Sequence, residues 1–370
     1  MPYREQMPID KGLDHTVAFL REGYKFISNR AKQYHRDIFE TRLLGGQKVI
    51  CLIGKDAAEL FYDNDKFKRH GAAPKRVLKT LFGQNGVQTL DDVKHRHRKN
   101  LFMSLMTQTR LQKVKDIFKE EWLQALQTWE KQNKIGLYDE ARAVLTRTAC
   151  RWAGVPLAIS DQEQKMNELS AMFEGGGAVG PRYMRGKQDR QKAEQWVGKL
   201  IGQVREGKMQ VDRETALYQI AMFKDQSGQL LPLSVAAVEL INILRPIVAI
   251  SVYIVFCALA LYDFPYEKEK LASGGNEAIH LFAEEVRRYY PFFPVTVARV
   301  REDFLWKGYD FKAGTLVLLD LYGTNHHPAI WEKPDEFMPE RFRTREKTHS
   351  ISFHKVAEII IATIAAPANG

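Results

Sequence analysis

The sequence predicts a mainly α-helical fold with a minor β portion, and three observations lead to this prediction. Apolar residues recur at helical spacing through most of residues 12–290. Short apolar runs follow between residues 293 and 321, as in strands joined by turns. Hydrophobic residues make up 45% of the 370, and no linker rich in Gly, Ser and Pro divides the chain. We therefore expect one domain over residues 1–343 and a tail of different character at 344–370.

The N-terminal part is expected to form a helix over residues 12–34 and a β-hairpin over residues 37–53. The helix is predicted from apolar residues near helical spacing, namely Leu13, Val17, Leu20, Tyr24 and Ile27. Gly45-Gly46 separates the two apolar runs of the hairpin. Further helices are expected, in chain order, over residues 56–65, 92–131 with a break near Thr107–Thr109, 139–153, 161–173, 187–206, 211–223, 232–262 and 276–290.

Two other kinds of segment complete the expected order of elements. A glycine-rich loop, GGGAVGPRYMRG, is expected at residues 175–186. Strands are expected in the C-terminal third, at Val295–Val300, Phe304–Trp306, Phe311 and Leu316–Leu319. Helix therefore dominates, and the strands form a smaller part of the same fold.

The formal net charge is +10, and a basic chain can bind nucleic acid, an anionic membrane surface or acidic small molecules. The 55 basic and 45 acidic residues are interleaved, and the densest basic run, His95–Lys99, contains no aromatic residue. We therefore expect a soluble enzyme with a basic surface and no nucleic-acid partner. A basic nucleic-acid-binding protein stays open as an alternative.

The three cysteines, Cys51, Cys150 and Cys257, are widely spaced and form no CxxC pair. An odd, scattered set argues against a disulfide framework or a structural zinc site. It is typical of a protein in the reducing cytoplasm. The N-terminal residues carry charges and lack a central apolar segment, so no signal peptide is predicted there.

Residues 246–262 carry no charge, but their number is slightly below the roughly 20 that a membrane span needs. Glu239, Asn242 and Arg245 lie directly upstream on what is predicted to be the same helix. A buried central helix explains this combination better than a membrane span.

A set of motifs in the C-terminal half points to a family. Glu285 and Arg288 lie at i and i+3 on a predicted helix and can pair. A β-rich stretch with GTLVLLDLYGTNHHP follows, and EFMPERF then adds Arg341. This ordered set resembles the cytochrome P-450 superfamily. The resemblance implies that Glu285, Arg288 and Arg341 form a buried ion network bracing the proximal side of haem b; the alternative is three unrelated surface charges.

Arg245 and Pro246 lie within a strongly apolar helix. Proline cannot donate to the carbonyl of Asn242, so the helix is expected to kink or open there. An arginine in apolar surroundings needs an anionic partner, and it can hold a carboxylate in a bidentate pair. A protein acid such as Glu239 is the alternative partner, although a spacing of i, i+6 places it on a different helix face.

This helix contains no Asp-Thr or Glu-Thr pair, and its Arg-Pro pair resembles the fatty-acid peroxygenase branch, also called fatty-acid alpha/beta-hydroxylases. The resemblance implies that the carboxylate of a long-chain fatty acid pairs with Arg245. That carboxylate then acts as general acid–base toward hydrogen peroxide. No dedicated reductase is implied when peroxide is the oxidant.

Three further segments resemble the same branch. The segment 81–104 implies that Phe82 and Gln88 lie near the distal pocket and that His95 and Arg98 face the haem propionates. The alternative for His95–Lys99 is a solvated basic helix face. Some relatives have histidine at the Gln88 position and favour decarboxylation, so glutamine points to hydroxylation.

The segments 175–187 and 289–304 imply an acyl-chain pocket lined by Phe173 and Phe292. The alternative is that both are ordinary core aromatics.

The resemblance ends after Arg343. The family continues with a glycine-rich loop that carries the haem cysteine and then a long helix, whereas residues 344–370 contain no cysteine. Cys257 lies 12 residues past Arg245, about 18 Å along a helix. We therefore expect a cytochrome P-450 fold truncated at its C-terminal side, with no metal ligand and impaired or absent activity, because the thiolate promotes peroxide cleavage.

The abrupt change at residue 343 suggests a frameshift or an alternative C-terminus. The second class of function is a non-catalytic remnant, or a fatty-acid-binding protein without haem.

Overall fold

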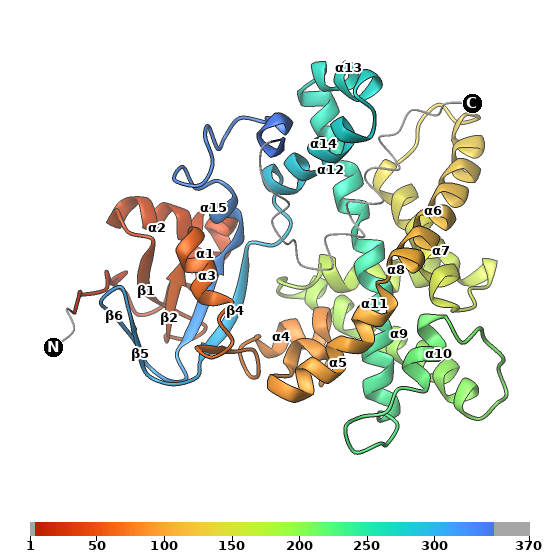
Figure 1. Cartoon of the computed structure of the whole chain (residues 1–370), viewed down its shortest axis with the longest axis horizontal. Coiled ribbons are helices and arrows are strands. Elements are labelled where there is room, and N and C mark those ends of the chain that lie inside the picture. The colour runs from red at the N-terminus through yellow and green to blue at the C-terminus, as the bar shows by residue number, and fades with distance from the viewer. Residues whose placement is uncertain (1–3, 344–370) are drawn as a thin grey trace. The chain divides into compact units, whose positions relative to one another are not determined.

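The computed structural model describes residues 4–343, and these residues divide into two compact units (Figure 1). One unit contains residues 4–73 and 287–338 and carries the named strands; the other contains 74–286 and 339–343 and is helical. The prediction of a mainly α fold with a minor β portion is confirmed. The expected single domain over residues 1–343 stays a prediction, and the tail at 344–370 lies outside the described residues.

A five-stranded sheet organises the first unit, in the order β1-β2-β7-β4-β3. The strands are β1 (Ile38–Leu43), β2 (Gln47–Leu52), β3 (Phe67–Lys68), β4 (Val295–Val300) and β7 (Leu316–Asp320). β1 and β2 form the predicted antiparallel hairpin, β2 and β7 are parallel, and β4 is antiparallel to β7. A second hairpin pairs β5 (Phe304–Trp306) with β6 (Tyr309–Phe311). The strands predicted between 295 and 319 are confirmed, and only the two-residue β3 was missed.

Both faces of this sheet are covered by apolar side chains. Alternate residues point to opposite faces of a strand, so Ile50 and Leu52 belong to one core cluster while Val49 and Cys51 belong to another. The central strands therefore read as continuous apolar runs rather than as alternating patterns.

The helices of this unit are short: α1 (Thr16–Glu22), α2 (Phe26–Tyr34), α3 (Lys55–Phe61) and α15 (Leu321–Asn325). The single helix predicted over residues 12–34 is wrong in two respects, because the first helical residue is Thr16 and the helix is divided. Gly23 adopts a φ of 56°, which ends α1, and a 3-10 turn leads into α2.

Asp320, at the end of β7, is 1% exposed. Its carboxylate accepts hydrogen bonds from the Gly323 backbone N–H at 2.7 Å and the Ser28 hydroxyl at 2.9 Å, and so begins α15. Burial outweighs these two bonds and raises the pKa of Asp320 to about 6. The carboxyl of Asp320 therefore binds a proton more tightly in the folded state than in the unfolded chain.

We expect a pH dependence of stability from Asp320. A raised folded-state pKa contributes stability below the ordinary value of 3.8, and this contribution is lost as the pH rises through about 6. The full contribution of this pKa shift to the free energy of unfolding is on the order of 3 kcal/mol. Urea unfolding on either side of this window measures it, and Asp320→Asn is expected to flatten the slope. An unchanged slope in that variant would show that another group titrates.

The second unit is built from helices. Those that run through its core and surface are α5 (Asp92–Leu105), α6 (Gln108–Trp129), α7 (Leu137–Ala153), α8 (Gln162–Glu174), α9 (Pro181–Arg205), α10 (Ala216–Ala221), α11 (Leu233–Ala249), α12 (Ser251–Asp263), α13 (Tyr266–Ser273) and α14 (Gly275–Tyr289), whose last three residues are assigned to the first unit. Shorter turns are α4 (Lys75–Val77), a π-helical turn at Leu78–Phe82, and 3-10 turns at Val87–Thr89, Ile159–Asp161 and Pro339–Phe342.

Most predicted helices are confirmed in this unit, and so is the break near Thr107–Thr109, which lies at Met106 and Thr107. The Thr107 hydroxyl caps α6. Pro181 starts α9 within the segment predicted as a loop, because proline suits the first position of a helix. The helix expected over 211–223 shrinks to α10, and α13 was not predicted.

α11 is the central helix of this unit and contacts α7, α8, α9 and α10 (Figure 1). Most of its side chains are buried, and many of the apolar ones belong to one large core cluster. In the described part of the chain, the continuous stretch Leu233–Asp263 is long and apolar enough to cross a membrane, but 61% of its most apolar window is buried inside the protein. This burial is as expected for a core helix.

Candidate functional site

Arg245 lies near the C-terminal end of α11 and is 7% exposed. Among the residues that the structure describes, no carboxylate lies within ion-pair distance of its guanidinium, and its Nε has no hydrogen-bond partner. Burial, together with the nearby charge of Arg190, lowers the pKa of Arg245 to about 9. Burying a guanidinium without a counter-charge costs folding free energy, and an anion bound beside Arg245 would offset this cost.

α11 continues through Pro246 and ends at Ala249. Proline removes the donor that would satisfy the Asn242 carbonyl, and it lies directly beside the unpaired arginine. The structure does not test the catalytic roles assigned to Arg245 and Pro246, which stay predictions.

Glu239, the alternative partner for Arg245, is engaged elsewhere. It is fully buried, and its Oε1 accepts from Arg98 Nη1 at 2.6 Å. Its Oε2 accepts from Asn242 Nδ2 at 3.2 Å. Burial raises the pKa of Glu239, and the charge of Arg98 partly opposes the shift. Glu239 therefore balances Arg98, and the described residues provide no ion pair between Glu239 and Arg245.

Gln88 is connected to the same helix face. Its Oε1 accepts from Asn242 Nδ2 at 3.1 Å, so one amide joins Gln88 to Glu239. Gly86 has no room for a side chain. A Cβ at this position would lie within 3.2 Å of side-chain atoms of Val238, Asn242 and Gln88. The segment that carries Gln88 is therefore packed tightly against α11.

Arg190, on α9, is a buried arginine that the sequence did not single out. It is 2% exposed, and its Nη1 donates to the backbone carbonyls of Thr80 at 3.2 Å and Leu81 at 2.8 Å. Its Nε donates to Glu194 at 2.6 Å. Arg190 thus holds the backbone directly before Phe82. Sequence offered one weak signal, the i, i+4 spacing of Arg190 and Glu194.

The buried charges around α11 leave one cation without a partner. Arg98 is balanced by Glu239, and Arg190 is balanced by Glu194. Arg245 has no such partner among the described residues. The arrangement can therefore take one carboxylate, and no further acid of the described chain competes for Arg245.

Gly83 is expected to tolerate no side chain. Its φ is 82°, and a Cβ would lie 2.2 Å from Arg190 Nη2 and 2.6 Å from Val238 Cγ1. We expect Gly83→Ala to lower the free energy of unfolding by about 2–4 kcal/mol, from backbone strain and overpacking together. Gly207→Ala is the matched control, since its φ is 69° and nothing lies within 4 Å. Equal losses in urea unfolding would show that strain alone acts at Gly83.

The other predicted site residues lie on several different elements. Phe82 ends the π-helical turn and Phe173 lies on α8, and both are half-buried. His95 lies on α5 and is also half-buried. Phe292 belongs to the first unit, where its ring lies 4.6 Å from that of Phe293. Their roles in an acyl-chain pocket or beside haem propionates stay predictions.

Two members of the predicted ion network pair in the helical unit. Glu285 is fully buried, and its Oε1 lies 3.3 Å from Arg341 Nε. Arg288, 3% exposed, donates within the first unit to the backbone carbonyls of Asn325, Pro334 and Glu336 at 2.8–3.1 Å. These bonds tie the end of α14 to the segment 325–336. The bracing of a haem by this network stays a prediction.

The cysteines do not provide a thiolate for a haem iron. Cys51, Cys150 and Cys257 are all buried. Burial raises the pKa of each thiol, to about 12 for Cys150 and further for the other two, so the protonated form dominates. The three thiols therefore do not fit a thiolate-ligated haem.

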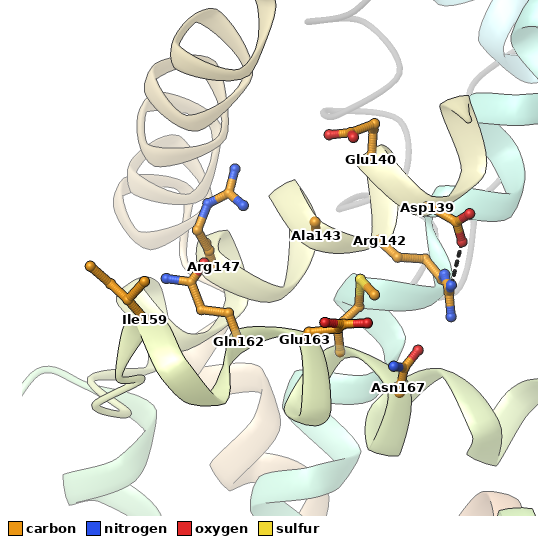
Figure 2. A pocket seen from close by; sticks show the side chains of 10 residues that line it. Asp139, Glu140, Arg142, Ala143, Arg147, Ile159, Gln162, Glu163 and Asn167 are labelled. Carbon is orange, nitrogen blue, oxygen red and sulfur yellow. Dashed lines mark hydrogen bonds and ion pairs between the residues drawn. The ribbon is translucent and has the colours of Figure 1, made fainter. Parts of the chain in front are cut away.

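A surface groove of about 540 Å³ lies between α7 and α8. Figure 2 shows Arg142 and Arg147 on the α7 side and Gln162, Glu163 and Asn167 on the α8 side. Arg142 is paired with Asp139 and Arg147 with Glu121. None of the predicted site residues lines this groove, so we assign the functional site to the buried Arg245 instead.

Comparisons with known proteins identify one family. The family model for cytochrome P-450 matches residues 280–356. Among curated proteins, rhazimal synthase of Alstonia scholaris is 39% identical over 74 residues, which is 20% of this chain but only 15% of that protein.

Solved structures resemble the whole chain. Cytochrome P450EX alpha (CYP152N1) with myristic acid is 46% identical, with a TM-score of 0.93, covering 98% of this chain and 90% of that one. Cytochrome P450SP alpha (CYP152B1) with (R)-ibuprophen is 40% identical, with a TM-score of 0.92, covering 96% and 90%. A variant of cytochrome P-450 OleT with arachidonic acid is 33% identical, with a TM-score of 0.94, covering 98% and 90%.

Proposed function

Because this chain belongs to the cytochrome P-450 family, in its fatty-acid peroxygenase branch, we propose that its buried site binds a long-chain fatty acid by pairing the carboxylate with Arg245. The observation that carries this proposal is the unpaired guanidinium of Arg245 among the described residues. A carboxylate supplies the missing charge and can accept two parallel N–H bonds. Two similar structures, which contain myristic acid and arachidonic acid, support a fatty acid as the ligand.

The neighbouring residues fit an amphiphilic ligand. Asn242 lies one turn before Arg245 on α11 and donates to Gln88, so both residues provide polar groups close to the arginine. We expect Phe82 and Phe173 to offer apolar surface for an acyl chain. In this proposal the bound carboxylate is the general acid–base toward hydrogen peroxide, and no dedicated reductase takes part. The product is a hydroxylated fatty acid, and the protein acts in the cytoplasm.

Cytochrome P-450 enzymes are oxidoreductases, and a haem, when bound, supplies the redox centre at which peroxide is activated. The 370 residues place no cysteine between 344 and 370, and the other three thiols are buried. We therefore propose that this chain is impaired or inactive as a peroxygenase. The same observation favours the second candidate, a fatty-acid-binding protein without haem.

Titration calorimetry of the haem-free chain tests the carboxylate site. Myristate is expected to bind, and the primary alcohol of the same length is expected to bind at least tenfold more weakly. The reason is that a charge-assisted hydrogen bond contributes about 1.5–3 kcal/mol. Equal affinities for acid and alcohol would overturn the proposal, because they would show that the acyl chain alone drives binding.

A further inference from the structure

Four large aliphatic side chains are exposed on one part of the strand-bearing unit. Leu13 is 90% exposed, Val17 78%, Leu20 53% and Leu44 51%. Val17 and Leu20 lie at i and i+3 on α1, so they share a helix face. We call these four residues the α1–hairpin patch. Single exposed aliphatics are ordinary, but a group of them marks an interaction surface.

Hydrogen bonds hold the two segments of the patch together. The Thr16 hydroxyl accepts from the Leu44 backbone N–H at 2.6 Å. The Asp14 carboxylate accepts from the backbone N–H groups of Gly45 and Gly46, each at 2.6 Å. The turn between β1 and β2 is therefore fixed against the start of α1, and Leu44 is presented beside the exposed residues of α1.

Leu44 is placed there against its local preference. Its φ is 56°, in the left-handed region that a branched aliphatic residue rarely adopts. Glycine would suit this turn position better, and two glycines follow directly. A strained backbone that presents an apolar side chain to solvent does not serve stability. It indicates a surface kept for contact with something else.

The charges around the patch are mostly positive. Lys11, Arg21 and Lys25 are exposed, and no described carboxylate lies within ion-pair distance of them. The acids Asp10 and Glu22 are both paired with Arg30, at 2.6 and 3.0 Å. Asp14 is the exposed acid within the patch, and its carboxylate is hydrogen-bonded to the backbone of Gly45 and Gly46. An exposed aliphatic group surrounded by unpaired cations is complementary to a layer of acyl chains beneath anionic headgroups.

We propose that the α1–hairpin patch docks this protein on the surface of an anionic phospholipid bilayer. The four aliphatic side chains enter the headgroup boundary, and Lys11, Arg21 and Lys25 contact the headgroups. A second copy of the chain is a poorer partner, because two basic patches facing each other repel. The inference does not depend on the proposed function, and its test needs neither haem nor turnover.

Vesicle co-sedimentation with the full chain tests this docking. The chain is expected to bind vesicles of phosphatidylcholine mixed with an equal amount of phosphatidylglycerol, and not phosphatidylcholine alone. Added salt is expected to weaken the binding by screening the cations. Val17→Asp is expected to weaken it about tenfold, which corresponds to about 1.4 kcal/mol. Ile159→Asp is the matched control, since Ile159 is 88% exposed in the other unit.

Leu44→Gly separates docking from folding. We expect it to raise the melting temperature, because it relieves the left-handed backbone, and to weaken vesicle binding at the same time. Three outcomes would overturn the proposal. The first is equal vesicle binding by Val17→Asp and Ile159→Asp, and the second is no vesicle binding by the unchanged chain. The third is a dimer of the unchanged chain that does not bind vesicles and that Val17→Asp dissociates.

Discussion

Replacing Arg245 by methionine is expected to abolish fatty-acid binding and to stabilise the ligand-free chain. The guanidinium is buried, and the described residues offer it no counter-charge. Methionine fills similar volume without a charge, so we expect the free energy of unfolding to rise by about 1–3 kcal/mol. The bound carboxylate would lose its only cationic partner, at a cost of about 3–5 kcal/mol in binding. Calorimetry with myristate and urea unfolding measure the two effects.

Arg205→Met is the matched control for Arg245→Met. Arg205 donates to the backbone carbonyls of Ala221 at 2.8 Å and Leu231 at 2.9 Å. Its loss is expected to destabilise the chain and to leave the affinity for myristate unchanged. Wild-type affinity in Arg245→Met would refute the carboxylate assignment. A loss of stability in that variant would show that the guanidinium has a partner within the fold.

The same arginine can be tested in turnover. In a chain that carries an intact cysteine loop after Arg343, we expect Arg245→Ala to lose activity on fatty acids. Acetate is not expected to restore fatty-acid binding. Wild-type turnover by that variant would contradict the assignment.

Glu285→Gln is expected to prevent accumulation of soluble, folded protein. Glu285 is fully buried and lies 3.3 Å from Arg341, whose side chain is 7% exposed. A neutral amide would remove the carboxylate that pairs with this buried arginine, at a cost of about 3–5 kcal/mol. This is a large share of the 5–15 kcal/mol that holds a typical domain folded. Soluble yield and the melting temperature report the effect.

Glu277→Gln gives the comparison for Glu285→Gln. Glu277 lies on the same helix, but its side chain is 66% exposed and 3.9 Å from Arg343. Exposed pairs contribute about 0–1 kcal/mol, so we expect little change in melting. If the two variants have equal melting temperatures, the ion pair between Glu285 and Arg341 does not stabilise the fold.

The long helices could be predicted from the sequence because their apolar periodicity extends over several turns. α7, α8 and α14 end within two residues of the predicted bounds. The errors arise where one residue decides the backbone. Gly23 takes a positive φ and divides the predicted first helix, and Pro181 starts α9 inside a glycine-rich stretch. Periodicity does not report on such single positions.

The candidate site was only partly predictable. Arg245 was singled out because an arginine in an apolar helix is rare, and it is indeed buried. Arg190 was not, because its helix is rich in polar residues and burial depends on the contact with the backbone of Thr80 and Leu81. The pairing of Arg98 with Glu239 joins residues 141 positions apart, a separation for which helical spacing gives no rule.

One spectrum tests most directly whether this chain keeps a peroxygenase fold without the thiolate that peroxygenase chemistry requires. It is the absorbance of the 370-residue chain mixed with haem, reduced and exposed to carbon monoxide. We predict that the red-shifted Soret band of thiolate ligation is absent, and that a family-type cysteine loop and helix grafted after Arg343 restore it. If the unchanged chain shows that band, one of Cys51, Cys150 or Cys257 reaches the iron, and the account is wrong.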